Sequence, residues 1–94
     1  MAGETDAKHY ATWLRTQPCC APGECLRNVE LHHPRHMVGL GMRASDSSAI
    51  PLCPRHHQHL HRLSGPFRGW DKSRRKSWER ERIEHHRSRY SEAA

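Results

Sequence analysis

The chain is short of the apolar residues from which a hydrophobic core is built. Only 34% of its 94 residues are hydrophobic, it has a single Phe, and its mean hydropathy is -1.03. A domain of this size buries a modest share of its unfolded surface, so it is marginal without metals, disulfides or oligomerisation. The composition therefore predicts one small domain that needs an additional source of stability.

Long hydrophobic runs are also lacking. No stretch approaches the length of a transmembrane helix, and residues 1–6, Met-Ala-Gly-Glu-Thr-Asp, offer no apolar run that could serve as a secretory signal. We therefore expect no membrane partner and a reducing cytoplasm. In that compartment the four cysteines favour metal-bound thiolates over the two disulfides expected of a secreted chain.

Acidic residues are in the minority. The 16 Lys and Arg residues outnumber the 10 Asp and Glu residues, which gives a net charge of +6 and a pI near 9.7. This balance favours a polyanionic partner, and nucleic acid is the usual one. Charge alone leaves a basic surface without a partner equally open.

The apolar pattern predicts a ββα unit in the middle of the chain. Residues 29–33 alternate apolar and polar side chains as a short strand does, and residues 49–52 could form a second strand. Residues 34–48 between them contain Gly39, Gly41 and the polar run at residues 45–48, so we expect a loop. A helix is expected to begin at Pro54, a residue favoured in the first turn, and to run to about Leu63.

A helix is expected on each side of this unit. Residues 6–16 place three apolar side chains on one helical face. Residues 71–90 carry eight of the 16 Lys and Arg residues and no clean apolar stripe, so we expect a mostly solvated basic helix pinned by Trp70 or Trp78. The predicted fold is a small α+β domain. An N-terminal helical extension, a core and a basic C-terminal helix are expected at residues 1–17, 18–66 and 67–94.

Cysteine spacing predicts a structural zinc site. Cys53 stands three residues before His56, which is the spacing of half a zinc knuckle. Cys25 would supply the other half with Cys20, at a common ligand spacing, or with Cys19 as the alternative. Such a closed Cys3His site would contribute its binding energy to folding. The competing interpretation is a set of ordinary buried thiols.

Histidines predict a second, open metal site. Seven of the ten histidines lie between His32 and His61. Residues four apart share one face of a helix, so His57 and His61 can bind the same ion. One of the pair His32 and His33 would complete three nitrogen ligands. Because strand side chains alternate, the other would lie near the metal without binding it, where a general base belongs. The alternatives are a purely structural second zinc and a fortuitous His-rich stretch.

Two segments resemble the HNH endonuclease family, whose ββα-metal fold is also called the His-Me finger. They are residues 29–33, Val-Glu-Leu-His-His, and residues 51–61, Pro-Leu-Cys-Pro-Arg-His-His-Gln-His-Leu-His. They are similar to a small branch found in phages and prophages, and the likeness covers about residues 18–63. The resemblance implies a ββα-metal core stapled by zinc. It also implies a nuclease that hydrolyses DNA with little sequence preference, in the cytoplasm of a bacterial or phage-infected cell.

The resemblance further implies roles for individual residues. His33 would be the general base that activates water. The ligands of one catalytic divalent metal (Mg2+, Mn2+, Ni2+ or Zn2+) would be His32, His57 and His61. The ligands of the structural zinc would be Cys20, Cys25, Cys53 and His56, with Cys19 as the alternative to Cys20. The DNA backbone would be held, besides the basic C-terminal helix, by Arg35, Arg43, Arg55 and Arg62.

The chain departs from the family pattern at the position of its central Asn, which should fall near Ser48; there, Asp46 or Ser48 would have to brace the loop. Two other functions remain open. A zinc-stabilised, non-catalytic nucleic-acid-binding module would keep the Cys3His site without needing His33. A zinc-folded adaptor in a phage or toxin system would use the basic helix to dock on protein. DNA is the expected ligand, and a phage or DNA-processing protein is a candidate partner.

Overall fold

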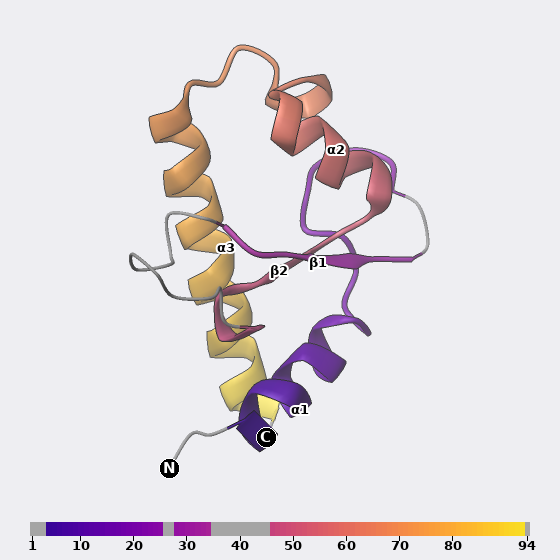
Figure 1. Ribbon diagram of the computed structural model, residues 1–94, viewed down its shortest axis with the longest axis vertical. Helices are drawn as coiled ribbons and strands as arrows, with labels where there is room; N and C mark the ends of the chain where they lie inside the picture. Colours follow the sequence, from indigo (N-terminus) through magenta and orange to yellow (C-terminus); the bar gives the residue numbers. More distant parts are fainter. Residues whose placement is uncertain (1–3, 26–27, 35–45, 94) are drawn as a thin grey trace.

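The computed structural model describes residues 4–25, 28–34 and 46–93. The fold is α+β, as the sequence predicts, and two strands are followed directly by a helix (Figure 1). The bounds of the elements, in chain order, are α1 (Glu4–Leu14), β1 (Glu30–His32), η2 (Asp46–Ser48), β2 (Ile50–Leu52), α2 (Pro54–Arg62), η3 (Gly65–Phe67) and α3 (Lys72–Ala93). In the part of the chain that is described, no helix is long and apolar enough to cross a membrane.

The strands β1 and β2 form a two-stranded antiparallel sheet. The register pairs Glu30 with Leu52 at one end and His32 with Ile50 at the other. Both strands are shorter than the sequence predicts. Pro51 has no N–H to donate, which is tolerated because each strand of a two-stranded sheet is an edge. Because β1 pairs with β2 and β2 leads directly into α2, the pairing brings β1 close to the start of α2, where histidines of the two elements lie near one another.

Helix α2 begins and ends with local signals that the sequence contains. Pro54 occupies the first turn, and the sulfur of the N-cap residue Cys53 accepts a hydrogen bond of 3.4 Å from the backbone N–H of His56. At the other end Leu63 adopts a left-handed conformation with φ 51° and closes the helix. The predicted helix from Pro54 to about Leu63 is therefore confirmed to within one residue.

Two hydrophobic clusters hold the elements together. The first joins the sheet, α2 and α3 through buried Leu52, Leu60, Phe67 and Ile83. The second joins α1 to the segment before β2 through Tyr10, Leu14 and Ala49, with Trp13 and Tyr90 packed against it. Burying this limited apolar surface is consistent with the low hydrophobic content of the chain.

Helix α3 is more closely integrated than the sequence predicts. Trp70, just before it, and Trp78 both pack on Phe67, each with ring centroids 5.1 Å apart, so the predicted pinning by tryptophan is observed. However, α3 also buries Glu79 and His86, and it runs behind the sheet along most of the domain (Figure 1). One face of this basic helix therefore belongs to the interior.

The turn η2 is tied to α3. The guanidinium group of Arg87 donates to the backbone carbonyl of Ser47 at 2.6 Å and to the hydroxyl of Ser48 at 3.1 Å. Ser48, one of two residues expected to brace the loop, is buried and accepts this hydrogen bond. The side chain of Arg87 on α3 thus holds η2 in place.

Candidate functional site

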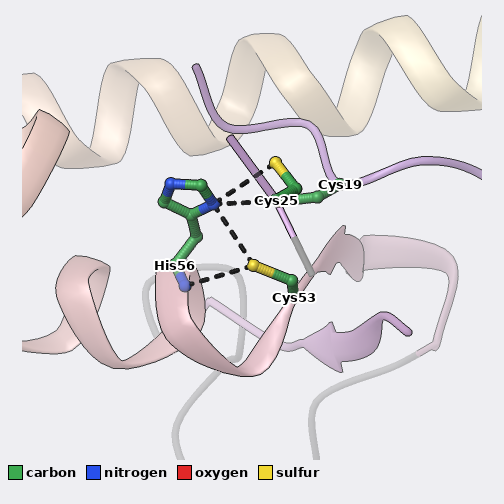
Figure 2. Close-up of side chains that lie close together, drawn as sticks. All are labelled: Cys19, Cys25, Cys53 and His56. Atoms are coloured by element: carbon green, nitrogen blue, oxygen red, sulfur yellow. Dashed lines mark hydrogen bonds between the residues drawn. The ribbon is translucent and has the colours of Figure 1, made fainter. Parts of the chain in front are cut away.

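Four side chains from distant segments gather at the start of α2, in what we call the cysteine cluster. Cys19, Cys25, Cys53 and His56 place their ligand atoms within 4.8 Å of one another (Figure 2). The three sulfurs lie 3.5, 3.4 and 3.3 Å from Nδ1 of His56. Three sulfurs and one imidazole nitrogen match the ligand set of a tetrahedral structural zinc. The cysteine cluster could therefore hold a metal ion such as zinc.

The structure separates the two adjacent cysteines. Cys20, the ligand expected from its spacing, is not among the clustered residues, whereas Cys19 is. The backbone N–H of Cys20 donates to the carbonyl of Pro51 in β2 at 3.0 Å, as a paired strand would, and successive side chains of such a segment point to opposite sides. The alternative named from the sequence is thus the cysteine that faces His56.

The enclosed position of the cysteine cluster affects protonation. Burial raises the pKa of the Cys19 thiol to about 12, and burial lowers the pKa of His56. The imidazole is therefore held in the neutral form that binds metals. A thiolate at Cys19 would in turn be stabilised by a bound cation, as zinc ligands are.

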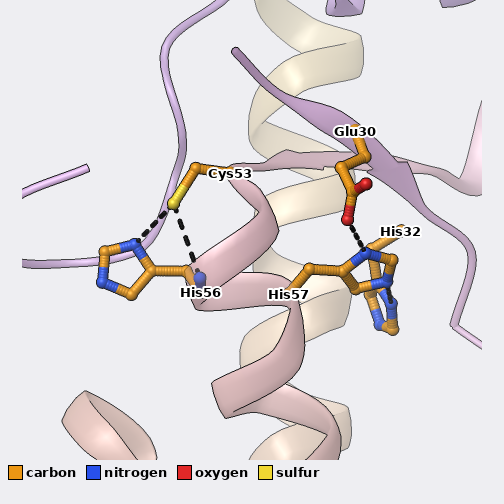
Figure 3. A network of polar contacts seen from close by, with 5 residues as sticks. All are labelled: Glu30, His32, Cys53, His56 and His57. Atoms are coloured by element: carbon orange, nitrogen blue, oxygen red, sulfur yellow. Dashed lines mark hydrogen bonds and ion pairs between the residues drawn. The ribbon is translucent and has the colours of Figure 1, made fainter. Parts of the chain in front are cut away.

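The next residue of α2 belongs to a second group, the histidine cluster. His57, His61 and His32 of β1 also place their ligand atoms within 4.8 Å of one another. Nδ1 of His32 lies 3.1 Å from Nε2 of His57, and the ring centroid of His61 is 4.8 Å from that of His57. The side chains of His56 and His57 leave α2 in opposite directions (Figure 3). The structure thus brings together the three histidines that the resemblance groups.

Two carboxylates lie behind the histidine cluster. Nδ1 of His57 is 2.7 Å from a carboxylate oxygen of Glu30, and Nε2 of His32 contacts the carboxylate of Glu79 (Figure 3 shows the first pair). In both rings the other nitrogen faces the neighbouring histidine. A carboxylate on the remote ring nitrogen fixes the tautomer and the orientation of a ligating histidine.

Sequence reasoning missed both carboxylates. Glu30 stands two residues before His32, so the alternation of a strand puts both on one face, and this signal was available. Glu79 is 47 residues from His32 on a helix expected to be mostly solvated, and no local pattern connects them. Its side chain is almost fully buried, with Nε of Arg75 3.9 Å from its second oxygen. A carboxylate so buried needs such partners.

The pKa of one member of the histidine cluster, His61, also suits metal binding. Burial lowers the pKa of His61, and the neighbouring His57 and His32 lower it further. A neutral imidazole is the form that donates its lone pair to a metal ion. His61 is therefore prepared to act as a ligand near neutral pH.

The histidine cluster borders a cleft of about 650 Å3. His32, His33 and His61 line one side, and the start of α3 lines the other. His33, the expected general base, is half-buried at this cleft. Three nitrogen ligands beside an open space leave room for water and a substrate oxygen, which a closed four-ligand site does not.

The expected DNA-binding arginines are only partly placed. Arg55 and Arg62 are exposed on α2, and neither lines the cleft. Arg35 and Arg43 lie outside the described residues, as does the side chain of Asp46. Among the described residues, the cationic side chains at the cleft come from α3.

Comparison with known proteins places the chain in a family. The uncharacterized protein YdfU of Escherichia coli (strain K12) is 35% identical over 57 residues, a match that covers 55% of this chain and 15% of the relative. The chain thus spans a small part of that relative's length. No solved structure matches. The family profile described as "Protein of unknown function (DUF968)" matches residues 3–80. Since that match covers most of the sequence, the chain belongs to the DUF968 family.

Proposed function

We propose that this domain is a metal-dependent HNH endonuclease that hydrolyses phosphodiester bonds in DNA with little sequence preference. The observation that carries the proposal is the histidine cluster beside the cleft, with His33 next to a ligand candidate, His32. The cysteine cluster on the other side of α2 supports it, because a closed staple and an open site are combined in one small core.

The proposed chemistry assigns work to each side chain at the cleft. A divalent ion held by His32, His57 and His61 would supply charge stabilisation at the scissile phosphate. His33 accepts a proton from the attacking water molecule while the new P–O bond forms and the bond to the leaving oxygen breaks. The leaving oxygen then takes a proton from solvent.

Glu30 and Glu79 are positioning residues in this scheme. Each holds the far nitrogen of one ligand imidazole, so the near nitrogen is directed toward the other histidines. Removing such a partner typically weakens metal affinity or activity by about 10–100-fold. Structural zinc at the cysteine cluster would have a different role, which is to supply folding energy that the small apolar core lacks.

The test is the conversion of supercoiled plasmid to nicked and linear forms by zinc-loaded protein with added Mg2+, Mn2+ or Ni2+. Wild type is expected to cut only with metal, and His33→Ala is expected to lose cleavage. The matched control is His9→Ala, which removes an exposed histidine on α1 and should cut normally. Circular dichroism and zinc content would show that both variants fold. A zinc-loaded wild type that binds the plasmid but leaves it intact with every metal would instead establish the non-catalytic binding module.

A further inference from the structure

We infer that the first turns of α3 bind the phosphate backbone of DNA in the cleft, opposite the histidine cluster. The side of the cleft that α3 contributes carries Lys72, Arg75 and Lys76, which we call the basic wall. This inference deepens the proposed function and rests on it for the reaction on the other side of the cleft. It narrows the DNA contact expected of the basic C-terminal helix to the first turns of α3, which lie outside the predicted core at residues 18–66.

The spacing of the basic wall concentrates positive charge on one helical face. Residues three and four apart on a helix are neighbours, so Lys72 lies beside both Arg75 and Lys76. Like charges at this spacing repel and destabilise a helix slightly. Within the described part of the chain no salt bridge joins either lysine to a carboxylate. An anion in the cleft would relieve this repulsion, which is the physical reason to expect one there.

The charge of the cleft matches a phosphodiester. At the cleft the three cations of the basic wall outnumber the single carboxylate among the described lining residues, that of Glu79. No Phe, Tyr or Trp side chain is among the described residues that line the cleft. Stacking on aromatic rings, the usual way to hold unpaired bases, is therefore not offered there. The contacts that remain are with backbone phosphates, which give affinity without reading sequence.

Arg75 differs from the two lysines because it also contacts Glu79, the carboxylate behind His32. Replacing Arg75 would disturb the histidine cluster as well as the basic wall. Lys72 and Lys76 are exposed, and among the described residues neither forms a salt bridge with a carboxylate, so they report on phosphate binding more cleanly. The experiment accordingly changes the lysines and leaves Arg75 in place.

The test measures binding of a short fluorescein-labelled DNA duplex by fluorescence anisotropy. It uses the whole zinc-loaded chain without added divalent metal, at KCl concentrations between about 50 and 200 mM. For Lys72→Ala/Lys76→Ala we expect the slope of log affinity against log salt to fall in magnitude by about 1.8, because each lost phosphate contact removes about 0.9. Lys72→Arg/Lys76→Arg should keep the wild-type slope. The α1 control, Lys8→Ala on α1 together with Arg15→Ala just after it, removes two exposed cations away from the cleft and should also keep it.

Three outcomes would overturn the basic wall: no duplex binding by wild type, an unchanged slope in the lysine-to-alanine variant, or an equal loss in the α1 control. Plasmid cleavage is read separately. If the lysine-to-alanine variant shows the expected fall in slope but wild type never cuts, the proposed nuclease activity is wrong and the basic wall stands as a nucleic-acid-binding surface. If wild type cuts and the slope does not change, the nuclease stands and the basic wall is wrong.

Discussion

The cysteine cluster and the histidine cluster start from adjacent residues of α2, His56 and His57, and point to opposite sides of the helix (Figure 3). The first has three sulfurs and one nitrogen, drawn from segments that would otherwise be held only by a small core (Figure 2). The second has three nitrogens, carboxylates in contact with two of the rings, and a cleft that His32, His61 and Glu79 help to line. One short helix thus contributes ligands to both sets, of which the first has four members and the second three.

Because the two clusters differ in this way, one helix could contribute both to the stability of the domain and to the proposed hydrolysis. Four protein ligands fill the coordination of a tetrahedral ion, so the cysteine cluster has no position for a substrate. Three ligands would leave at least one position, and in the proposed nuclease the cleft would give a substrate access to it. We therefore expect changes in the cysteine cluster to act on folding, and changes around the histidine cluster to act on the affinity for a second metal.

The largest expected effect comes from breaking the cysteine cluster with Cys53→Ser. Cys53 is fully buried and caps α2, and structural zinc in small domains is worth about 10–16 kcal/mol of apparent binding energy. We expect the variant to lose its zinc and its cooperative thermal transition, measured by a colorimetric zinc assay and by circular dichroism.

The control for this change is the neighbouring pair of cysteines. Cys20→Ser should retain one zinc per chain, because Cys20 lies outside the cluster, and Cys19→Ser should lose it. The reverse result would make Cys20 the ligand and would contradict the arrangement at the start of α2.

A smaller effect is expected from Glu79→Gln, which tests whether this carboxylate positions a ring of the histidine cluster. The amide keeps the shape of the carboxylate but loses the charge that holds Nε2 of His32. We expect the affinity for a second divalent metal, such as Ni2+ in a calorimetric titration, to fall by about 10–100-fold while the zinc content is unchanged. Glu81→Gln, an exposed change on the same helix, should have no effect. Equal affinities in all three proteins would remove Glu79 from the site.

The smallest expected effect concerns a histidine outside both clusters and its contribution to the loss of stability in acid. Burial lowers the pKa of His86, which lies in neither cluster. The folded state therefore disfavours its charged form, so this histidine contributes stability above the ordinary pKa of about 6.5 and loses it as pH falls below that value. His86→Gln should show a shallower loss of thermal stability below about pH 6.5 than wild type. Parallel curves would show that protonation of His86 does not contribute to the acid sensitivity.

Much of the candidate site follows from local spacing. His57 and His61 meet because four residues make about one helical turn, and Cys53 faces His56 because an N-cap residue lies beside the first turn. Pro54 and Leu63 mark the ends of α2 with little help from the rest of the chain. Short-range patterns of this kind can be read from the sequence because the backbone geometry of one element fixes them.

The α+β class, the strand–strand–helix order and the ligands that α2 contributes to each cluster could be predicted from the sequence, because each depends on periodicity within a few residues. Three features depended on tertiary packing instead: Cys19 rather than Cys20 faces His56, Glu79 reaches His32, and α3 forms one side of the cleft. These contacts join segments up to 47 residues apart. They depend on how separate elements pack around the core, and no local pattern in the sequence encodes that packing.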